Sequence, residues 1–255
     1  MQGSTLCDLR STVTAADNLP RPDYSVIVPT YNERQNVAIL VYLLHKYLAD
    51  LVSFEIIFVD DNSPDGTADA VELQIKPLYP RVHLVRRPKR AGLGSAYQHG
   101  VAKALGSFII LMDADLSHHP RHLPVFIEQQ RKTGADIVTS TRYQAGGGVA
   151  GWNLLRKFTS RGANLLASFL LGATVSDLTG SYRLYQHEAL GKLLAATASQ
   201  GYAFQMEVII RAQYAGMRLV EVPIVFVDRI YGNSKLGWGE YLQFIRGLLR
   251  LLMSL

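Results

Sequence analysis

The stretch Phe108-Ile109-Ile110-Leu111-Met112-Asp113-Ala114-Asp115 decides the fold of this chain. Its five large apolar residues run without a break into two acids that are separated by one alanine. Such a run predicts a central strand that is buried on both faces. Residues two apart in an extended strand point the same way, so Asp113 and Asp115 should converge on one spot. Because charges are costly to bury, that spot should be the carboxyl end of the strand, where it opens to solvent.

Two carboxylates at one spot repel each other unless a cation lies between them. Carboxylate oxygens suit Mg²⁺ or Mn²⁺, which commonly bind one or two acids and complete their shell with substrate phosphate. The alternative is that Asp113 and Asp115 only cap the next helix or face water, and for an isolated Asp-x-Asp we would favour it. The rest of the sequence decides between the two.

The composition is that of a globular protein with an anionic partner. The chain has 255 residues, of which 48% are hydrophobic and 18% charged, and its net charge is +5. This length suits one large α/β domain, and the positive charge favours a nucleotide, a lipid phosphate, a membrane surface or a nucleic acid as partner. The single cysteine, Cys7, excludes an intrachain disulfide and favours a reducing compartment. No stretch approaches the ~20 apolar residues of a membrane span, so we expect a soluble or peripheral protein.

Apolar, β-rich runs alternate with helical patterns through the first half of the chain. This alternation predicts an α/β fold with a mainly parallel, twisted sheet and helices on both faces. Ligands of such sheets bind beyond the carboxyl ends of the strands. The expected strands are Ser25–Val28, Glu55–Val59, Val82–Arg86, Phe108–Met112 and Asp136–Thr141, and the expected helices are Gln35–Leu48, Thr67–Ile75, Gly94–Leu105 and Leu123–Lys132.

The second half is less regular. We expect a flexible loop over Gln144–Gly151, which holds three successive glycines and is a candidate lid. A helical stretch should follow over Trp152–Leu171, basic at first and then strongly apolar. Further strands are predicted at Ser181–Tyr185 and Leu219–Val227, around helices near Glu188–Ala196 and Met206–Tyr214.

Polar groups follow four of the predicted strands. Each group has a local explanation, and Asp65-Gly66-Thr67, for example, is typical of a turn that caps a helix. Together they combine an aromatic face, hydrogen-bond acceptors, a metal pair and a cation around one crevice, which suits a base, a ribose and a diphosphate. The sequence therefore predicts a nucleotide-sugar site lined by Tyr31, Glu33, Asp61, Asp113, Asp115 and Arg142.

Three other patterns are weaker. Gly92-Leu93-Gly94 lacks the third glycine of a dinucleotide fingerprint, because Tyr97 stands there, so we interpret it as a tight helix entry. The basic cluster of Arg86, Arg87, Lys89 and Arg90 lacks interleaved aromatic residues and favours a solvated face or a phosphate contact over nucleic acid. The histidines His118, His119 and His122 have no third soft ligand nearby, so we interpret them as structural.

The polar motifs resemble those of the inverting GT-A glycosyltransferases of the polyprenyl-phosphate type. The resemblance rests on Pro29-Thr30-Tyr31-Asn32-Glu33, on Asp60-Asp61-Asn62-Ser63-Pro64-Asp65-Gly66-Thr67 and on Asp113-Ala114-Asp115-Leu116-Ser117-His118-His119-Pro120. Within that group, the catalytic subunits of dolichol-phosphate mannosyltransferases are the most similar. This narrower resemblance rests on Ser160-Arg161-Gly162-Ala163-Asn164, Asp177-Leu178-Thr179-Gly180-Ser181-Tyr182-Arg183-Leu184-Tyr185, Phe204-Gln205-Met206-Glu207 and Val227-Asp228-Arg229-Ile230-Tyr231-Gly232-Asn233-Ser234-Lys235-Leu236-Gly237.

The resemblance implies a role for each matching residue. The guanosine of GDP-mannose would be held by Pro29, Tyr31, Glu33, Val59 and Asp61. Asp113 and Asp115, with the Ala114 backbone alongside, would bind the Mg²⁺ or Mn²⁺ that bridges the diphosphate. Phosphates would be contacted by Arg142, Arg229 and Lys235, and the acceptor phosphate by Arg142, Arg161 and Arg229. Ser117 stands where some relatives carry a glutamine, so a third side-chain metal ligand is not expected from the pattern.

The implied activity is transfer of mannose from GDP-mannose to dolichyl phosphate with inversion, for glycosylation and GPI-anchor pathways. The implied place is the cytosolic face of the endoplasmic reticulum membrane, as a peripheral protein bound to small membrane-spanning subunits and not to nucleic acid. Open alternatives are a UDP-glucose-dependent glucosyltransferase, an NAD-dependent oxidoreductase and a phosphate-binding regulatory module. Glu207 is the remaining acid that could act as a base, and we favour a role in orienting an arginine or Gln205.

The predicted organisation is a mobile tail over residues 1–22, a GT-A catalytic domain over 23–238 and an amphipathic helix over 239–255. In that helix one apolar stripe recurs at spacings of three and four, with Arg246 and Arg250 outside it. We expect the stripe, the apolar stretch Ala163–Leu171, or both to lie against a membrane or small membrane subunits, with packing on the catalytic domain as the alternative. The stripe consists of Tyr241, Phe244, Ile245, Leu248, Leu249 and Leu252.

Overall fold

A computed structural model describes residues 20–199, 203–228 and 238–254 of the chain. Within these residues, seven strands form one sheet in the order β3-β2-β1-β4-β7-β5-β8. Their bounds are β1 Tyr24–Thr30, β2 Phe54–Asp60, β3 Val82–Arg86, β4 Phe108–Leu111, β5 Ile137–Thr141, β7 Arg183–Gln186 and β8 Leu219–Pro223. A second, two-stranded sheet pairs β6 (Gly148–Ala150) with β9 (Val225–Val227).

The strand order places a ligand crevice beside β1. From β1 the chain runs outward to β2 and β3 on one side, and then returns to add β4 on the other side. The pairs β1–β2, β2–β3, β1–β4 and β5–β8 are parallel, whereas β7 runs antiparallel between β4 and β5. The carboxyl ends of β1, β2, β4 and β5 therefore meet at one edge, and the change of direction at β1 and β4 is where such sheets bind ligands.

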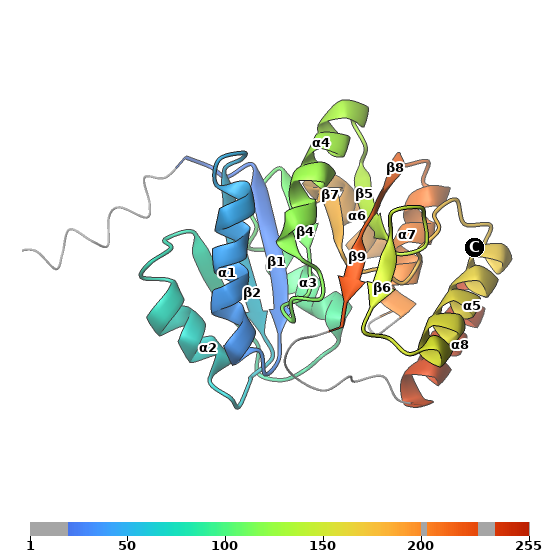
Figure 1. The fold of residues 1–255 in the computed structure, drawn as a ribbon, viewed down its shortest axis with the longest axis horizontal. Coiled ribbons are helices and arrows are strands. Elements are labelled where there is room, and N and C mark those ends of the chain that lie inside the picture. The colour runs from blue at the N-terminus through green and yellow to red at the C-terminus, as the bar shows by residue number, and fades with distance from the viewer. Residues whose placement is uncertain (1–19, 200–202, 229–237, 255) are drawn as a thin grey trace, which may run out of the picture.

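Helices cover both faces of the sheet (Figure 1). One face packs against α1 (Arg34–Leu48) and α4 (Leu123–Thr133), and the other against α3 (Leu93–Val101), α6 (His187–Ala196) and α7 (Ala203–Tyr214). Alternation along β1 shows this division: Val26 and Val28 belong to the core around α1, whereas Ile27 belongs to the core that contains Tyr97 of α3. The remaining helical segments are α2 (Thr67–Asp69), which continues as a π-helical turn over Ala70–Ile75, a 3₁₀ turn over Pro120–His122, α5 (Leu154–Leu170) and α8 (Trp238–Ser254).

The predicted α/β fold, with a mainly parallel sheet and helices on both faces, is confirmed. Two details of the second half were predicted wrongly. Residues 148–150 form strand β6 within the segment we expected to be a loop, and the expected strand Leu219–Val227 is two strands in different sheets. The reason is that Ile224 leaves the main sheet: its N–H donates to the Thr141 carbonyl, and its own carbonyl accepts from Gly148. No helix among the described residues is long and apolar enough to cross a membrane.

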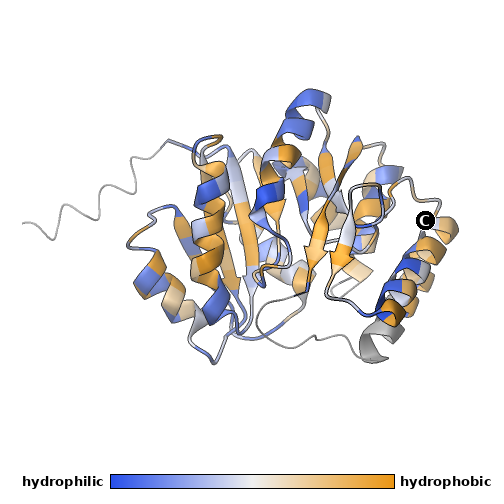
Figure 2. Ribbon diagram, viewed as in Figure 1, coloured by the Kyte–Doolittle hydropathy of each residue, from blue (hydrophilic) through white to orange (hydrophobic). Residues whose placement is uncertain are grey.

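The apolar stripe predicted for the C-terminal helix needs correction. In α8, Leu248 packs on the core, whereas Ile245, Leu249 and Leu252 are exposed, and the side chains of Tyr241 and Phe244 lie outside the described residues. Six large apolar side chains of α5 are between 56% and 82% exposed. Figure 2 shows hydrophobic residues along the visible side of α5, interrupted by hydrophilic ones. The expected contact of these helices with a membrane or with small membrane subunits stays a prediction.

Candidate nucleotide-sugar site

The acidic pair lies directly beyond the end of β4, as the strand pattern predicts. Asp115 is buried, and its Oδ1 accepts hydrogen bonds from the Ser117 amide (3.1 Å) and the Ser117 hydroxyl (2.5 Å). The turn that brings Ser117 back to Asp115 needs a left-handed residue, and Leu116 supplies it with a φ of 63°. A β-carbon makes that conformation costly, so the surrounding packing must enforce it. Ser117 thus fixes the orientation of Asp115.

Asp113 is more open, and its partners come from other parts of the chain. Its Oδ2 accepts a hydrogen bond from the Ser181 hydroxyl (3.1 Å), and the Nδ1 of buried His118 lies 3.5 Å from the same oxygen. The His118 ring stacks on Tyr182 with centroids 5.0 Å apart, which fixes its plane. Ser181 and Tyr182 precede the antiparallel strand β7, so this strand brings them beside Asp113. No local sequence pattern predicted either contact.

The loops after β1 and β2 are joined into one wall of the crevice. The Asn32 amide donates to the Ser63 hydroxyl (3.0 Å), and the Glu33 amide donates to the Thr67 hydroxyl (2.9 Å). Asp65 accepts from the amide of Thr67 (2.9 Å), so the predicted turn is present, whereas the residue at the N-cap of α2 is Gly66, which forms no side-chain capping hydrogen bond. The predicted nucleoside residues Pro29, Tyr31, Glu33, Val59 and Asp61 all belong to these two strand ends.

Two members of the basic cluster turn toward this wall. Arg87 is buried and forms an ion pair with Asp61. The sequence did not predict this partner for Asp61. The Arg90 guanidinium lies over the Tyr31 ring, 4.5 Å from its centroid. By contrast, Arg86 forms an exposed ion pair with Asp69. Arg86 therefore lies on a solvated face, as one of the two interpretations expected, whereas a phosphate contact by any member of the cluster stays a prediction.

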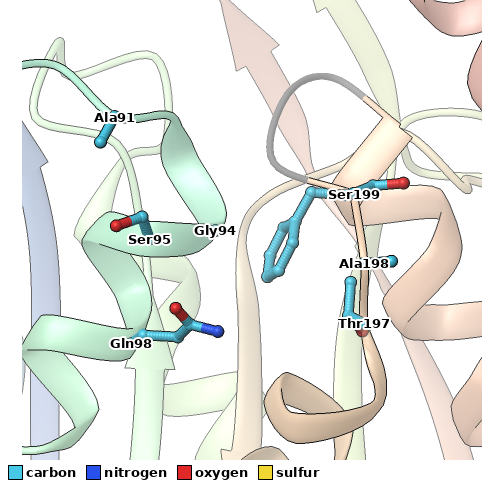
Figure 3. A pocket seen from close by; sticks show the side chains of 8 residues that line it. Ala91, Gly94, Ser95, Gln98, Thr197, Ala198 and Ser199 are labelled. Atoms are coloured by element: carbon cyan, nitrogen blue, oxygen red, sulfur yellow. The ribbon is translucent and has the colours of Figure 1, made fainter.

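A cavity of about 180 Å³ lies near Arg87. Arg87 Nη1 donates to the hydroxyl of Ser95, which lines the cavity, so the cavity is one side chain away from the Arg87–Asp61 pair. Figure 3 shows residues of α3 on one side of the cavity and the segment before α7 on the other. Its lining consists of Ala91, Gly94, Ser95, Gln98, Thr197, Ala198, Ser199 and Phe204.

Glu207 anchors the far wall of this cavity. Its carboxylate accepts from the amides of Ala198 (3.1 Å) and Ser199 (3.0 Å), and Arg211 Nε donates to it at 2.7 Å. Burial would raise the pKa of Glu207, but these hydrogen bonds hold it below the usual value. A carboxylate with three donors and a low pKa is a poor proton acceptor. This geometry favours the orienting role for Glu207, and its partner is an arginine, as we expected.

Arg142 follows the end of β5 and forms an ion pair with Asp177, an acid that we did not predict as part of the site. Its Nε and Nη2 donate to the two carboxylate oxygens of fully buried Asp177 at 2.7 and 2.8 Å, and Nη2 also donates to the Thr179 hydroxyl at 2.6 Å. Burial would lower the pKa of Arg142, but the charge and hydrogen bonds of Asp177 raise it above the usual value. Burial would likewise raise the pKa of Asp177, but Arg142 holds it below the usual value.

A second buried arginine, Arg183, ties the floor of the site together. It is fully buried and donates to the carbonyls of Leu178 (3.1 Å) and Gln205 (2.8 Å) and to the Thr139 hydroxyl (3.1 Å). These bonds join the loop that holds Asp177 to the first turn of α7 and to β5. Arg183 belongs to the Asp177–Tyr185 segment of the resemblance, and its hydrogen bond to the Gln205 carbonyl connects that segment to Phe204–Glu207.

For the other predicted phosphate-binding residues, the described part of the chain does not show a side chain in the crevice. Arg161 is exposed on α5, whereas Arg229 and Lys235 lie outside the described residues, so their phosphate contacts stay predictions. Of the three clustered histidines, His122 has its pKa lowered to about 4 by burial and by the charge of Arg121. It is therefore uncharged at neutral pH and adds no phosphate-binding charge.

The acidic pair offers oxygen ligands but no complete metal cage. Among the residues that the structure describes, no group of three or more histidine, cysteine or acidic side chains could hold a metal ion. An ion at Asp113 and Asp115 would thus need further oxygens from substrate or water, which is the usual arrangement for Mg²⁺. The hydroxyls of Ser117 and Ser181 orient the two carboxylates for such a ligand. The residues present fit a small divalent cation.

Comparison with known proteins agrees with this architecture. "Polyprenol monophosphomannose synthase" of Mycolicibacterium smegmatis is 40% identical over 215 residues, which cover 83% of this chain and 80% of that protein. "Undecaprenyl-phosphate mannosyltransferase" of Micrococcus luteus is 36% identical over 217 residues, covering 84% of this chain and 87% of that protein.

Solved structures share the fold at lower identity. Glucosyl-3-phosphoglycerate synthase from Mycobacterium tuberculosis, in complex with Mn²⁺, uridine diphosphate and glucosyl-3-phosphoglycerate, superposes with a TM-score of 0.65 at 19% identity. The match covers 100% of this chain and 85% of that one. The fold is thus of the GT-A type. The family model described as "Glycosyl transferase family 2" matches residues 25–194. This chain belongs to glycosyl transferase family 2.

Proposed function

We propose that this chain transfers mannose from GDP-mannose to a polyprenyl phosphate. The observation that carries the proposal is the position of Asp113 and Asp115 just beyond the carboxyl end of β4, at the sheet edge where the joined loops of β1 and β2 also lie. Mannose and a polyprenyl acceptor are supported by the two relatives, whose names state that they form or transfer to such lipids.

On the donor side, Tyr31 and Asp61 would receive the nucleoside, and Asp113 and Asp115 would hold Mg²⁺ or Mn²⁺ against the diphosphate. When bound, that ion would neutralise charge on the leaving diphosphate. Ser117 and Ser181 contribute by keeping the two carboxylates in fixed orientations. Arg87 would keep Asp61 in place, because its guanidinium is buried and paired with that acid.

On the acceptor side, a phosphate oxygen would attack the anomeric carbon as GDP leaves. Attack from the face opposite the leaving group converts an α-linked donor into a β-linked product, through a transition state of oxocarbenium character. A phosphomonoester has a second pKa near ~6, so at neutral pH it is largely dianionic and needs no base. A mechanism without a base agrees with the position of Glu207, whose carboxylate already accepts from three hydrogen-bond donors.

The acceptor phosphate would be held by Arg161 and Arg229, with Arg142 at the edge of the site. The hydrogen bonds to Asp177 and Thr179 use the Nε and Nη2 groups of Arg142, so its Nη1 group would be the one to meet a phosphate. Arg161 is exposed and therefore open to a large lipid substrate.

The resemblance adds finer elements to the proposal: dolichyl phosphate as the acceptor, the cytosolic face of the endoplasmic reticulum, small membrane-spanning partner subunits, and supply of glycosylation and GPI-anchor pathways. The two bacterial relatives support only the coarser class of polyprenyl phosphates. Dolichyl phosphate differs from undecaprenyl phosphate in having a saturated first isoprene unit. Paired assays with the two lipids would therefore settle the acceptor.

The decisive experiment incubates the purified chain with each donor and acceptor in turn and identifies the product by mass spectrometry and anomeric proton NMR. We expect mannolipid of β configuration from GDP-mannose, and none from UDP-glucose. Product from UDP-glucose alone would reassign the chain as a glucosyltransferase. The matched control is Asp113→Asn, which should form no product while keeping the circular dichroism spectrum of the native chain.

Alanine variants separate the two substrates. Arg161→Ala should weaken use of the lipid phosphate more than binding of GDP-mannose, because Arg161 is expected on the acceptor side. Calorimetric titration measures the affinity for GDP-mannose. Turnover at varied lipid concentration measures how well the lipid phosphate is used. Equal loss of both would assign Arg161 to the diphosphate instead.

A further inference from the structure

Two aromatic side chains of the small β6–β9 sheet contact each other. Phe226 is the central residue of β9, and Trp152 lies two residues beyond the end of β6. The two strands lie side by side (Figure 1) and pair in parallel, with Val149 opposite Phe226. This pairing brings the rings of Trp152 and Phe226 edge to face, with centroids 5.6 Å apart and planes at 67°.

Both rings contact Arg142, one of the predicted phosphate-binding residues. Its guanidinium lies 5.8 Å from the centroid of each ring and 5.3 Å from that of Tyr143. A cation within about 6 Å of a ring centroid is attracted to that ring. Asp177 holds Nε and Nη2 of the same guanidinium, and the Arg142 side chain is only 10% exposed. The direction of Arg142 is therefore set by the rings together with the carboxylate.

Phe226 also contacts the residues that hold the acidic pair. Its ring is edge to face with that of His118, with centroids 5.4 Å apart and planes at 75°. His118 Nδ1 in turn lies 3.5 Å from Asp113 Oδ2. The backbone continues the link, because the Val227 amide donates to the carbonyl of Ser117 (3.4 Å), whose hydroxyl orients the second acid. One side chain thus contacts both Arg142 and the histidine beside Asp113.

The two groups that Phe226 links lie in each other's electric field. Burial acts to lower the pKa of Arg142, whereas the negative charges of Asp177 and, to a lesser degree, Asp113 act to raise it. Arg142 and Asp113 are therefore close enough for a change in the position of one to alter the potential at the other.

The turn after β6 holds Trp152 in place against Phe226. Arg156 pairs with Asp228 at 3.2 Å, and its guanidinium lies 4.0 Å from the Trp152 ring centroid. Gly151, just before Trp152, has a φ of 84°, and a β-carbon there would lie 2.9 Å from Asp228 Cβ. The close approach of these two segments therefore depends on a glycine.

We propose that Phe226 is a positioning residue that sets the placement of Arg142 relative to Asp113. The inference rests on the proposed function, in which Asp113 would hold the ion on the leaving diphosphate and Arg142 would meet a phosphate. Phe226 acts on Asp113 through His118 and on Arg142 by direct contact. It touches neither substrate in this arrangement.

This placement matters because the attacking and leaving oxygens must lie in line with the anomeric carbon. A displacement of about 1 Å between groups that hold the reactants can slow the chemical step by about a hundredfold. A side chain that only fills space could be replaced by an aliphatic one of similar size. Edge-to-face contacts with Trp152 and His118 instead require a ring.

The first test compares an aliphatic and an aromatic replacement. Phe226→Leu keeps an apolar side chain and removes the ring contacts, so we expect kcat to fall by about tenfold. The affinity for GDP-mannose, measured by calorimetry, should change by less than about twofold. Phe226→Tyr keeps the ring and should retain most of the turnover. The matched control is Val227→Ala, which shortens the next side chain of β9, 40% exposed, and should leave kcat unchanged.

The second test does not depend on transfer. The Nε–H of Arg142 donates to Asp177 at 2.7 Å in a nearly buried site, so its ¹⁵N–¹H resonance should exchange slowly with water. The resonance is assigned by its loss in Arg142→Lys. In Phe226→Leu the exchange should accelerate by about tenfold or more, because the ring no longer covers the guanidinium. Phe226→Tyr and Val227→Ala should exchange at the native rate.

The outcomes separate this inference from the proposed function. Native kcat in Phe226→Leu, or native exchange of the Arg142 resonance in that variant, would overturn the positioning role. So would an equal loss of kcat in Phe226→Leu and Phe226→Tyr, because the ring would then not be the feature that matters. If the native chain transfers no mannose, the proposed function fails, and the exchange measurement still decides whether Phe226 holds Arg142. If Phe226→Leu unfolds the chain, Phe226→Met is the substitute.

Discussion

Glu207 provides the sharpest test of the site, because a base and an anchor respond differently to the same substitution. We expect Glu207→Gln to keep turnover, since the amide oxygen can still accept one of the two backbone hydrogen bonds and the acceptor phosphate needs no base. Glu207→Ala should be far more damaging, because it removes every acceptor for the amides of Ala198 and Ser199 and leaves Arg211 without its acid.

The magnitudes follow from the three contacts. Each hydrogen bond to a charged group contributes ~1.5–3 kcal/mol, and water replaces part of this where the donor is accessible, as at Ala198. We therefore expect Glu207→Ala to lower the free energy of unfolding by ~2–4 kcal/mol and Glu207→Gln by ~1–2 kcal/mol. The Arg211 side chain is 26% exposed, so Arg211→Ala, the matched control, should cost only ~0–1 kcal/mol.

The pH dependence has a definite sign. The pKa of Glu207 is lowered in the folded chain, so the folded state favours the ionised form, and its contribution to stability is fully present above the ordinary value of 4.5. That contribution is lost as the pH falls below 4.5 through the lowered folded pKa. The stability difference between the native chain and Glu207→Gln should therefore shrink on acidification.

Urea unfolding measured by tryptophan fluorescence gives the free energies, and turnover with GDP-mannose and a polyprenyl phosphate gives the activity. The reasoning is refuted if Glu207→Gln keeps its stability and binds both substrates, yet forms no product. Glu207 would then be the base, and the hydrogen bonds to Ala198 and Ser199 would be incidental.

Three further changes test other parts of the site. Asp115→Asn should abolish Mg²⁺- or Mn²⁺-dependent transfer with the fold intact, and full activity in excess chelator would contradict the metal role. Asp177→Ala should lower the free energy of unfolding in urea by ~3–5 kcal/mol, because it leaves the buried charge of Arg142 without a partner. Gly100→Ala should lower the melting temperature, at a cost of ~1–3 kcal/mol, because its new β-carbon would lie 2.5 Å from Ile27 Cγ2. An unchanged melting temperature there would show that α3 can move away from the sheet.

Local sequence patterns were sufficient to predict the position of a residue where that position depends only on whether its side chain faces solvent or the core. Strand β3 begins and ends as predicted, and Asp113 and Asp115 lie beyond β4 because the apolar run of that strand ends before them. Asp115 is in a turn, so the alternation of an extended strand does not apply to the pair. In α5 the spacing of apolar residues predicted a helix, but periodicity does not say whether the apolar side faces inward. Only the structure shows that it faces outward.

Contacts between distant segments carried no such pattern. Arg87 meets Asp61 across 26 positions, Arg142 meets Asp177 across 35, and Ser181 meets Asp113 across 68. Strand β6 is a similar case, because its short, glycine-containing segment acquires strand geometry only by pairing with β9, far along the chain. Such pairs depend on the strand order, and above all on the antiparallel insertion of β7, which no local signal announced.

The pairing of Arg142 with Asp177 changes how the charge of the site is to be understood. Counted from the sequence, Arg142 offers a positive charge to the substrate phosphates. In the structure, that charge is balanced by a fully buried acid held in two hydrogen bonds, so the pair is neutral as a unit. The proposed nucleotide diphosphate and lipid phosphate would together bring several negative charges to a crevice that already contains Asp113 and Asp115. Under that proposal, the balancing charge would come from a divalent cation at the acidic pair and from other cations. Arg90, which lies over Tyr31, is a candidate for that role, and the phosphate contact of Arg161 on α5 stays a prediction.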